Sequence, residues 1–229
     1  MIEALFIGFL LGIRHAMESD HVAAVASLVT KSPTMQESIL LGSVWGLGHT
    51  VTLFAFGLAV LMLDKMIPEH LALALEFIVG FMLVVLGIDV IRRFMQERVH
   101  LHPHRHEDGV LHIHAHSHHN TGEAKHQHQH HKTFPMRALL VGIMHGMAGS
   151  AALIILTLQT VHSVATGLIY IALFGIGSIA GMALLSVVIM LPLRHSAKYF
   201  SNLHLYLQLL IGSATTLLGM SIMFEIANT

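Results

Sequence analysis

Six apolar stretches, each long enough to cross a lipid bilayer as a helix, limit the folds open to this chain. A helix rises about 1.5 Å per residue, so about 20 apolar residues cross a hydrocarbon core of about 30 Å. The stretches occupy residues 2–29, 38–62, 67–93, 135–160, 163–193 and 202–225. Of the 229 residues, 54% are hydrophobic and 11% are charged, which does not suit a soluble domain. We therefore predict an all-α, polytopic membrane protein with six transmembrane helices.

Charge and cysteine content argue against several other kinds of protein. The first stretch lacks a basic start and contains Arg14, Glu18 and Asp20, so we do not expect a cleaved signal peptide. The formal net charge is −1, which provides no field for binding nucleic acid. Because the chain has no cysteine, it can hold neither a disulfide framework nor a thiolate metal site.

The two halves of the chain repeat the same motifs in the same order. Residues 11–17 read Leu-Gly-Ile-Arg-His-Ala-Met, and 130 positions later residues 141–147 read Val-Gly-Ile-Met-His-Gly-Met. Two further pairs match at offsets of 129 and 132 positions: 45–49 with 174–178, and 75–87 with 207–219. Three ordered matches indicate an internal duplication. Because each unit has three spans, an odd number, the second unit enters the membrane upside down, and we predict a 3+3 inverted repeat.

The repeat divides the chain into three parts. We expect a first three-helix repeat at 1–94, a histidine-rich loop at 95–134 and a second three-helix repeat at 135–229. Ten of the 12 Lys and Arg residues fall on one side of the predicted membrane, and the positive-inside rule makes that side cytoplasmic. The expected location is the cell (inner) membrane, with both termini outside and the loop in the cytoplasm.

A cluster of ionisable residues lies inside the first apolar stretch: His15, Glu18, Asp20 and His21. Each such group costs about 2.5 to 3.5 kcal/mol at membrane depth, and a bound cation would explain their presence. Nitrogen and carboxylate donors without sulfur suit nickel, cobalt, zinc or manganese and disfavour copper(I). The alternative is an ion pair between Arg14 and Glu18, with the histidines serving as donors in helix packing.

These residues can share an ion only if the helix is interrupted. On a regular helix Asp20 and His21 would point about 120 to 140° away from His15, so we predict an opening at residues 17–19. The glycine-rich segment 145–150 predicts a second broken helix facing the first. We also expect His49 and His145 to line the ion path, although either alone would suit a hydrogen-bonded interior histidine.

The segment from His15 to Asp20 and His21 resembles the His-x4-Asp-His signature of the nickel/cobalt transporter family, and Leu-Gly-His-Thr follows at 47–50. The resemblance covers the chain outside the loop, although many family members have eight spans. It extends to urease-accessory-type relatives and histidine-rich nickel/cobalt exporters. It implies that His15, Asp20, His21 and His49 select and carry the metal, with import and export both open.

The loop is dominated by histidine. Residues 100–131 hold 13 of the 21 histidines, and without apolar residues to form a core we predict a disordered segment that buffers or senses metal. An inserted purification tag is the alternative. The expected ligands are His112, His114, His116, His118, His119, His126, His128, His130 and His131.

Metal transport is the function that we expect from these features, with Ni²⁺ or Co²⁺ preferred over Zn²⁺ or Mn²⁺ and no further cofactor. A membrane metal sensor or accessory subunit that binds without conducting would use the same ligands. The chain has neither the His-Glu-x-x-His helix of a metalloprotease nor a phosphate-binding loop, so we expect no enzyme activity. The expected partners are the metal ion and the bilayer, with a second copy of the chain or a metallochaperone as further candidates.

Overall fold

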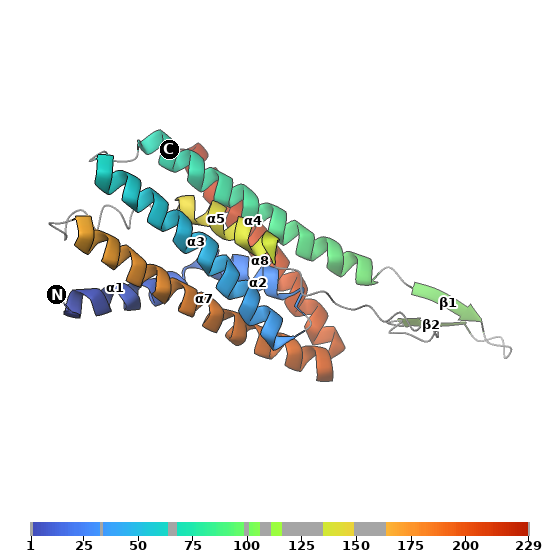
Figure 1. The fold of residues 1–229 in the computed structure, drawn as a ribbon. Helices are drawn as coiled ribbons and strands as arrows, with labels where there is room; N and C mark the ends of the chain where they lie inside the picture. The colour runs from blue at the N-terminus through green and yellow to red at the C-terminus, as the bar shows by residue number, and fades with distance from the viewer. Residues whose placement is uncertain are drawn as a thin grey trace.

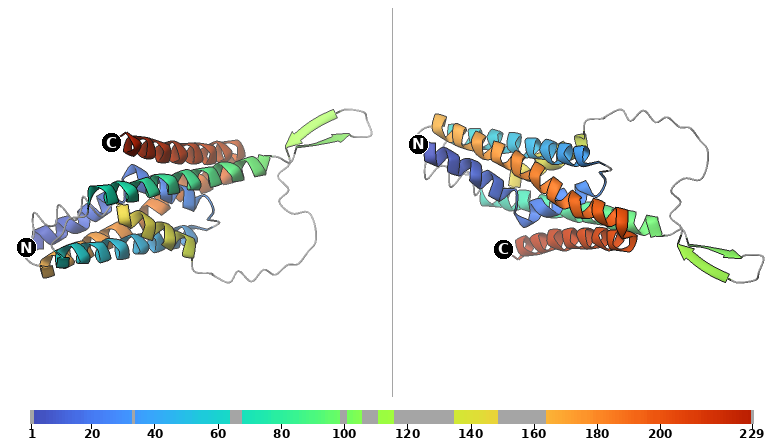
Figure 2. Two further views of the ribbon diagram at one scale, coloured as in Figure 1. Left: turned by 90° about the horizontal axis from the view of Figure 1, so that it is seen from above. Right: turned by 90° about the horizontal axis from the view of Figure 1, so that it is seen from below.

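The membrane part of the chain is a bundle of helices. The computed structural model describes residues 2–32, 34–63, 68–98, 101–105, 111–115, 135–148 and 164–228. The helices in these ranges are α1 (Ile2–His15), α2 (Ser19–Val29), α3 (Met35–Leu63), α4 (Glu69–Arg98), α5 (Met136–Ala148), α7 (Val164–Tyr199) and α8 (Ser201–Ala227). They run roughly along one axis, with both termini at the same end of the bundle (Figure 1, Figure 2). The prediction of a helical membrane protein is confirmed.

Four of these helices, α3, α4, α7 and α8, are long and apolar enough to cross a membrane. The described helices α1, α2 and α5 have 14, 11 and 13 residues, too few for one of them to cross a 30 Å core alone. Four of the six predicted spans are therefore found as single helices. The predicted span 2–29 is divided between α1 and α2, and the span 135–160 begins with α5 and then leaves the described residues.

The break between α1 and α2 lies at residues 16–18. The amide groups of Met17 and Glu18 donate to the carbonyl oxygens three residues earlier, at 2.9 and 3.0 Å, which tightens the end of α1. Glu18 then adopts an extended conformation, with φ −65° and ψ 150°, and Ser19 begins α2 in a new direction. The interruption predicted at residues 17–19 is confirmed, one position earlier. Of the segment 145–150, where the second interruption is predicted, residues 145–148 are still helical in α5, and residues 149–150 lie outside the described residues.

Glycines bring two pairs of helices into backbone contact. A Cβ atom on Gly12 of α1 would overlap the carbonyl oxygen of Phe174 in α7, and one on Gly142 of α5 would overlap that of Trp45 in α3. Gly142 follows Gly12 by 130 positions, and Phe174 follows Trp45 by 129, which are the offsets of the sequence repeat. Corresponding residues of the two halves therefore make corresponding contacts.

The same correspondence holds where α4 crosses α8. Gly80 of α4 packs against the backbone of Gly219, and Gly212 of α8 packs against the backbone of Gly87. Gly212 and Gly219 follow Gly80 and Gly87 by 132 positions. The contact between Gly80 and Gly219 and the contact between Gly212 and Gly87 are therefore equivalent in the repeat.

The loop contains a short β-hairpin at the end of the bundle opposite the termini (Figure 2). Strand β1 (Leu101–Arg105) pairs antiparallel with β2 (Leu111–Ala115), and His104 lies opposite His112 in the register. The prediction of a wholly disordered loop is wrong for these two segments. Apolar residues alternate with histidine along β2, which is a strand pattern that histidine content alone does not reveal. The predicted ligands from His116 to His131 lie outside the described residues.

Candidate metal centre

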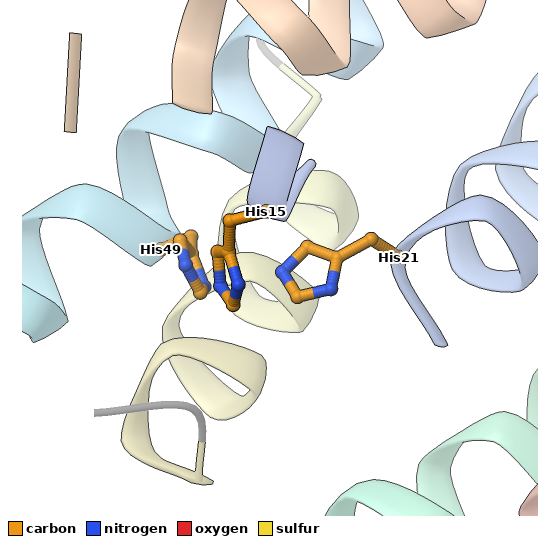
Figure 3. A group of neighbouring side chains, drawn as sticks. All are labelled: His15, His21 and His49. Atoms are coloured by element: carbon orange, nitrogen blue, oxygen red, sulfur yellow. The ribbon is translucent and has the colours of Figure 1, made fainter. Parts of the chain in front are cut away.

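Four histidines from four different helices converge where α1 ends. They are His15 of α1, His21 of α2, His49 of α3 and His145 of α5. The ring of His21 is central, with ring centroids 4.4 Å from His15, 5.1 Å from His49 and 4.3 Å from His145. Figure 3 shows that the rings of His15, His21 and His49 approach one another from three separate segments. The structure thus brings together histidines that the sequence separates by as much as 130 positions.

The break after α1 makes this convergence possible. His15 is the last residue of α1, and His21 lies in the first turn of α2, so the turn between them decides where both rings point. On one continuous helix the two rings would lie on different faces. The break instead places the ring of His21 against that of His15, and both against α3.

Asp20 holds two of the histidines in place. Its Oδ1 accepts a hydrogen bond from His21 Nδ1 at 3.1 Å, and its Oδ2 accepts one from His145 Nε2 at 2.8 Å. Each bond fixes which ring nitrogen carries the proton. The opposite nitrogens, His21 Nε2 and His145 Nδ1, therefore carry free lone pairs. A carboxylate that orients histidines in this way is a common neighbour of metal ligands.

Several buried histidine nitrogens have no hydrogen-bond partner among the described residues. They are His15 Nε2, His21 Nε2, His145 Nδ1 and both ring nitrogens of His49. Buried polar atoms are normally paired, because leaving one unpaired costs about 1 to 3 kcal/mol. A group of lone pairs in one buried place is the arrangement that a metal ion satisfies.

The donor atoms form two overlapping groups of three. One contains His15, His21 and His49, the other contains Asp20, His21 and His145, and within each group the donor atoms lie within 4.8 Å of one another. Metal bonds of about 2.1 Å hold ligands at most about 4.2 Å apart, so small side-chain rotations suffice to close either group on an ion. His21 belongs to both groups.

Glu18 lies at the edge of this cluster and belongs to neither group. Its side chain is 57% exposed, and its Oε2 accepts from His15 Nδ1 at 3.1 Å. That bond leaves His15 Nε2 free to face the other histidines. Among the described residues Glu18 makes no ion pair with Arg14, so the alternative explanation of the cluster receives no support from the structure.

Comparison with known proteins gives the family of this chain. The chain is 36% identical over 232 residues to the urease accessory protein UreH of Bacillus sp. (strain TB-90), a match that covers 100% of this chain and 94% of that protein. It is 26% identical over 223 residues to a Methanocaldococcus jannaschii protein named as a nickel/cobalt efflux system, covering 93% of this chain and 88% of that protein. The chain belongs to the nickel/cobalt transporter family. The resemblance carried by the His-x4-Asp-His signature is confirmed.

A more distant relative of this nickel/cobalt transporter family member is a plant protein. Arabidopsis thaliana chloroplast protein FOR GROWTH AND FERTILITY 1 is 27% identical over 183 residues, covering 79% of this chain and 48% of that protein. No family model matches the chain, and no solved structure does.

Two aromatic residues that the sequence did not single out surround the site in this family member. Trp45 is fully buried, and its ring centroid lies 5.3 Å from that of His21 and 5.5 Å from that of His145. The ring centroid of Phe174 lies 5.2 Å from that of His15. Such an apolar shell restricts water around the donors. The sequence feature that could have indicated their role is that Trp45 and Phe174 occupy matching positions of the repeat.

Proposed function

We propose that this chain transports a divalent transition-metal ion, nickel or cobalt, across a cell membrane. The observation that supports this most is the cluster of buried, unpartnered histidine nitrogens beside a broken helix, because interrupted helices are where transporters bind their ions. Nitrogen donors with one carboxylate fit nickel, cobalt and zinc and, less well, manganese. The name of one relative, a nickel/cobalt efflux system, favours nickel and cobalt among these, and neither relative, the other being a urease accessory protein, is named as an enzyme.

In this proposal the two donor groups are successive positions of the ion. Both contain His21, so the two positions adjoin at its ring, and an ion passes from His15 and His49 to Asp20 and His145 by exchanging one donor group for the other. Asp20 contributes the negative charge that offsets part of the charge of the cation. The side chain of Asp20 is 27% exposed and that of His15 is 13% exposed, whereas the side chain of His21 is buried, with 1% exposed. In this proposal the ion therefore enters and leaves past Asp20 and His15.

The proposal includes the 3+3 inverted repeat, with units at 1–94 and 135–229 joined by the loop at 95–134. The glycine contacts described above support it, because Gly12 on Phe174 and Gly142 on Trp45 are related by the same offsets as the sequences. The metal centre breaks the symmetry, since Ser178 occupies the position that corresponds to His49. An asymmetric site at the interface of two symmetric halves is the arrangement expected of a transporter.

The loop is proposed to face the cytoplasm, with both termini outside. In support, the termini lie at one end of the bundle and the hairpin at the other (Figure 2). Among the described residues, the last turns of α4 and α7 carry Arg92, Arg93, Arg98, Arg194 and Lys198. Because the chain has no cysteine, single cysteines can report topology. We expect an impermeant thiol reagent to label Thr229→Cys from outside and to label Ser117→Cys only in permeabilised cells. Labelling of Ser117→Cys alone in intact cells would reverse this topology.

Metal buffering is the role proposed for the loop histidines. In the hairpin, His102 lies opposite His114 and His104 opposite His112, a register that sets histidines in cross-strand pairs. Histidine binds metal only when it is deprotonated, and its ordinary pKa is about 6.5, so binding should weaken as the pH falls below about 6. The membrane site draws on none of these residues.

A second function, an accessory subunit or sensor that binds metal without moving it, is favoured by the name of the urease accessory relative. A metallochaperone or another copy of the chain would then be the natural partner. The ligands are the same in both cases, so flux rather than binding separates the two functions.

Flux is best measured with the purified chain alone in lipid vesicles. With radiolabelled nickel outside, we expect time-dependent uptake above that of protein-free vesicles, because downhill movement needs no energy source. A chain lacking residues 100–131 should retain this uptake, since the four central histidines lie outside the loop. Calcium, which prefers oxygen ligands, is the control ion and should not enter. Tight nickel binding without uptake would establish the accessory function instead.

A further inference from the structure

A pocket with no part in the metal centre opens at the hairpin end of the bundle. Its volume is about 390 Å³, and it lies between the end of α2, the last turns of α7 and the start of α8. Figure 1 shows that α7 ends and α8 begins at the end of the bundle nearest the hairpin, away from the termini. Ligand pockets usually measure about 300 to 1,000 Å³, so this one can hold a small group.

The charge in the pocket wall is positive. Arg194 and Lys198, four residues apart on α7, both line it, and they are the only Lys and Arg residues of that helix. Among the residues that the structure describes, no Asp or Glu lines the pocket. Within the described ranges Arg194 makes no ion pair, and the Lys198 ammonium lies 5.0 Å from the centroid of the Tyr199 ring. Two cations without a neighbouring carboxylate are therefore available to an anion.

An unused hydroxyl group lies in the same wall. Ser32 is 8% exposed, and its buried Oγ has no partner among the described residues. The neighbouring Thr30 differs, because its hydroxyl already donates to the carbonyl oxygen of Ser27 at 2.7 Å. Ser32 Oγ can therefore donate to a group bound in the pocket.

His204 also lines the pocket, and its ring nitrogens are already engaged within the protein. Its Nδ1 donates to the carbonyl oxygen of Leu193 at 3.2 Å, and its Nε2 accepts from Gln208 Nε2 at 3.0 Å. Both ring nitrogens are thus hydrogen-bonded within the protein, and the ring is held in place. The anion therefore faces Arg194 and Lys198 rather than His204.

The remaining wall is apolar, with Val29, Met190 and Leu193 among its residues. Cations on one side and hydrocarbon on the other match the border between the headgroups and the acyl chains of a bilayer. The position along α7 agrees, since Arg194 is the first charged residue after an uncharged run from Val164 to Leu193.

We propose that this pocket binds the phosphate group of an anionic phospholipid. Arg194 and Lys198 pair with the phosphate, Ser32 Oγ donates to one of its oxygens, and the glycerol and first acyl carbons lie on the apolar wall. Basic pockets between transmembrane helices are known sites for lipid headgroups. A free phosphate ion has the same charge chemistry but makes no use of the apolar wall.

The test uses the full chain with a fluorophore on Asn202→Cys, two residues from His204 in α8. In phosphatidylcholine bilayers, brominated phosphatidylglycerol should quench this fluorophore with an apparent affinity at least about tenfold higher than brominated phosphatidylcholine. Arg194→Gln with Lys198→Gln should abolish this preference. Ala197→Phe, which keeps both cations but fills the pocket, should abolish it too. The matched control is Arg92→Gln with Arg137→Gln, which removes two exposed cations elsewhere and should retain it.

Three results would overturn the proposal. If the control pair loses the preference as fully as the pocket pair, the lipid responds to total surface charge and not to this pocket. If excess inorganic phosphate in the buffer displaces the brominated phosphatidylglycerol, the pocket holds free phosphate rather than a lipid. Retained preference in Ala197→Phe would likewise place the lipid elsewhere.

Discussion

Replacing His21 with alanine should abolish nickel and cobalt transport while the chain still folds and inserts. His21 belongs to both donor groups, so its loss leaves two ligands in each of them and removes the residue that joins them. Changing residues that merely orient ligands typically costs 10- to 100-fold in metal affinity or activity, and losing a ligand shared by both positions should cost about 100-fold or more. Vesicle uptake and equilibrium nickel binding measure the two effects separately.

Asp20→Asn is the companion variant in the same experiment. It keeps the shape of the side chain but removes its charge, and its NH₂ group cannot accept the hydrogen bond that one of the two histidine partners donates. We expect a loss of about 10- to 100-fold in nickel affinity. His70→Ala, the same substitution at an exposed histidine of α4, is the control and should behave as wild type. Near-normal uptake by a well-inserted His21→Ala protein would place the ion elsewhere.

Adding one methyl group at Gly142 should destabilise the whole bundle. The new Cβ atom would overlap the carbonyl oxygen of Trp45 and come within 3.1 Å of His49 N, both backbone atoms that cannot rotate away. Overpacking of this kind costs about 1 to 3 kcal/mol, and here it would also push α3 away from α5, which carry His49 and His145. We expect Gly142→Ala to lower both the thermal unfolding midpoint in detergent and the nickel affinity.

Two other glycines make this experiment specific. Gly57→Ala is the control, because its Cβ atom would meet the side chain of Ile171, whose terminal methyl can move. Gly12→Ala changes the corresponding residue of the first half, against Phe174, and should destabilise the protein by a similar amount. An unchanged midpoint for Gly142→Ala would mean that the two helices can separate without cost, which contradicts the crossing as described.

The broken helix could be predicted because chemistry required it. His15, Asp20 and His21 cannot meet on a regular helix, so a shared ion implied an opening, and the structure has one at residues 16–18. The repeat likewise indicated His145 as a residue of the ion path, because it is the counterpart of His15. Both inferences use local spacing or self-similarity, which a sequence displays directly.

Features that depend on contacts between distant segments could not be predicted. Asp20 serves two histidines from different helices only because α5 packs against α3, and no spacing encodes that contact. Trp45 resembled an ordinary buried aromatic residue, and Ser32 an ordinary polar residue at the end of a helix. The hairpin was missed for another reason, since the abundance of histidine hid the alternation of residues along β2.

The break between α1 and α2 also makes the metal centre a hinge. α1 packs against α7, whereas α2 is held to α8, where Ser27 Oγ and Thr215 Oγ1 lie 3.1 Å apart. α2 thus has a neighbour, α8, in addition to the α7 helix that both short helices contact, and the chain between α1 and α2 is the turn at residues 16–18. Tilting α1 relative to α2 changes the separation of His15 and His21 directly. In the proposed transporter, the separation of two ligands of the ion therefore depends on the angle between two short helices.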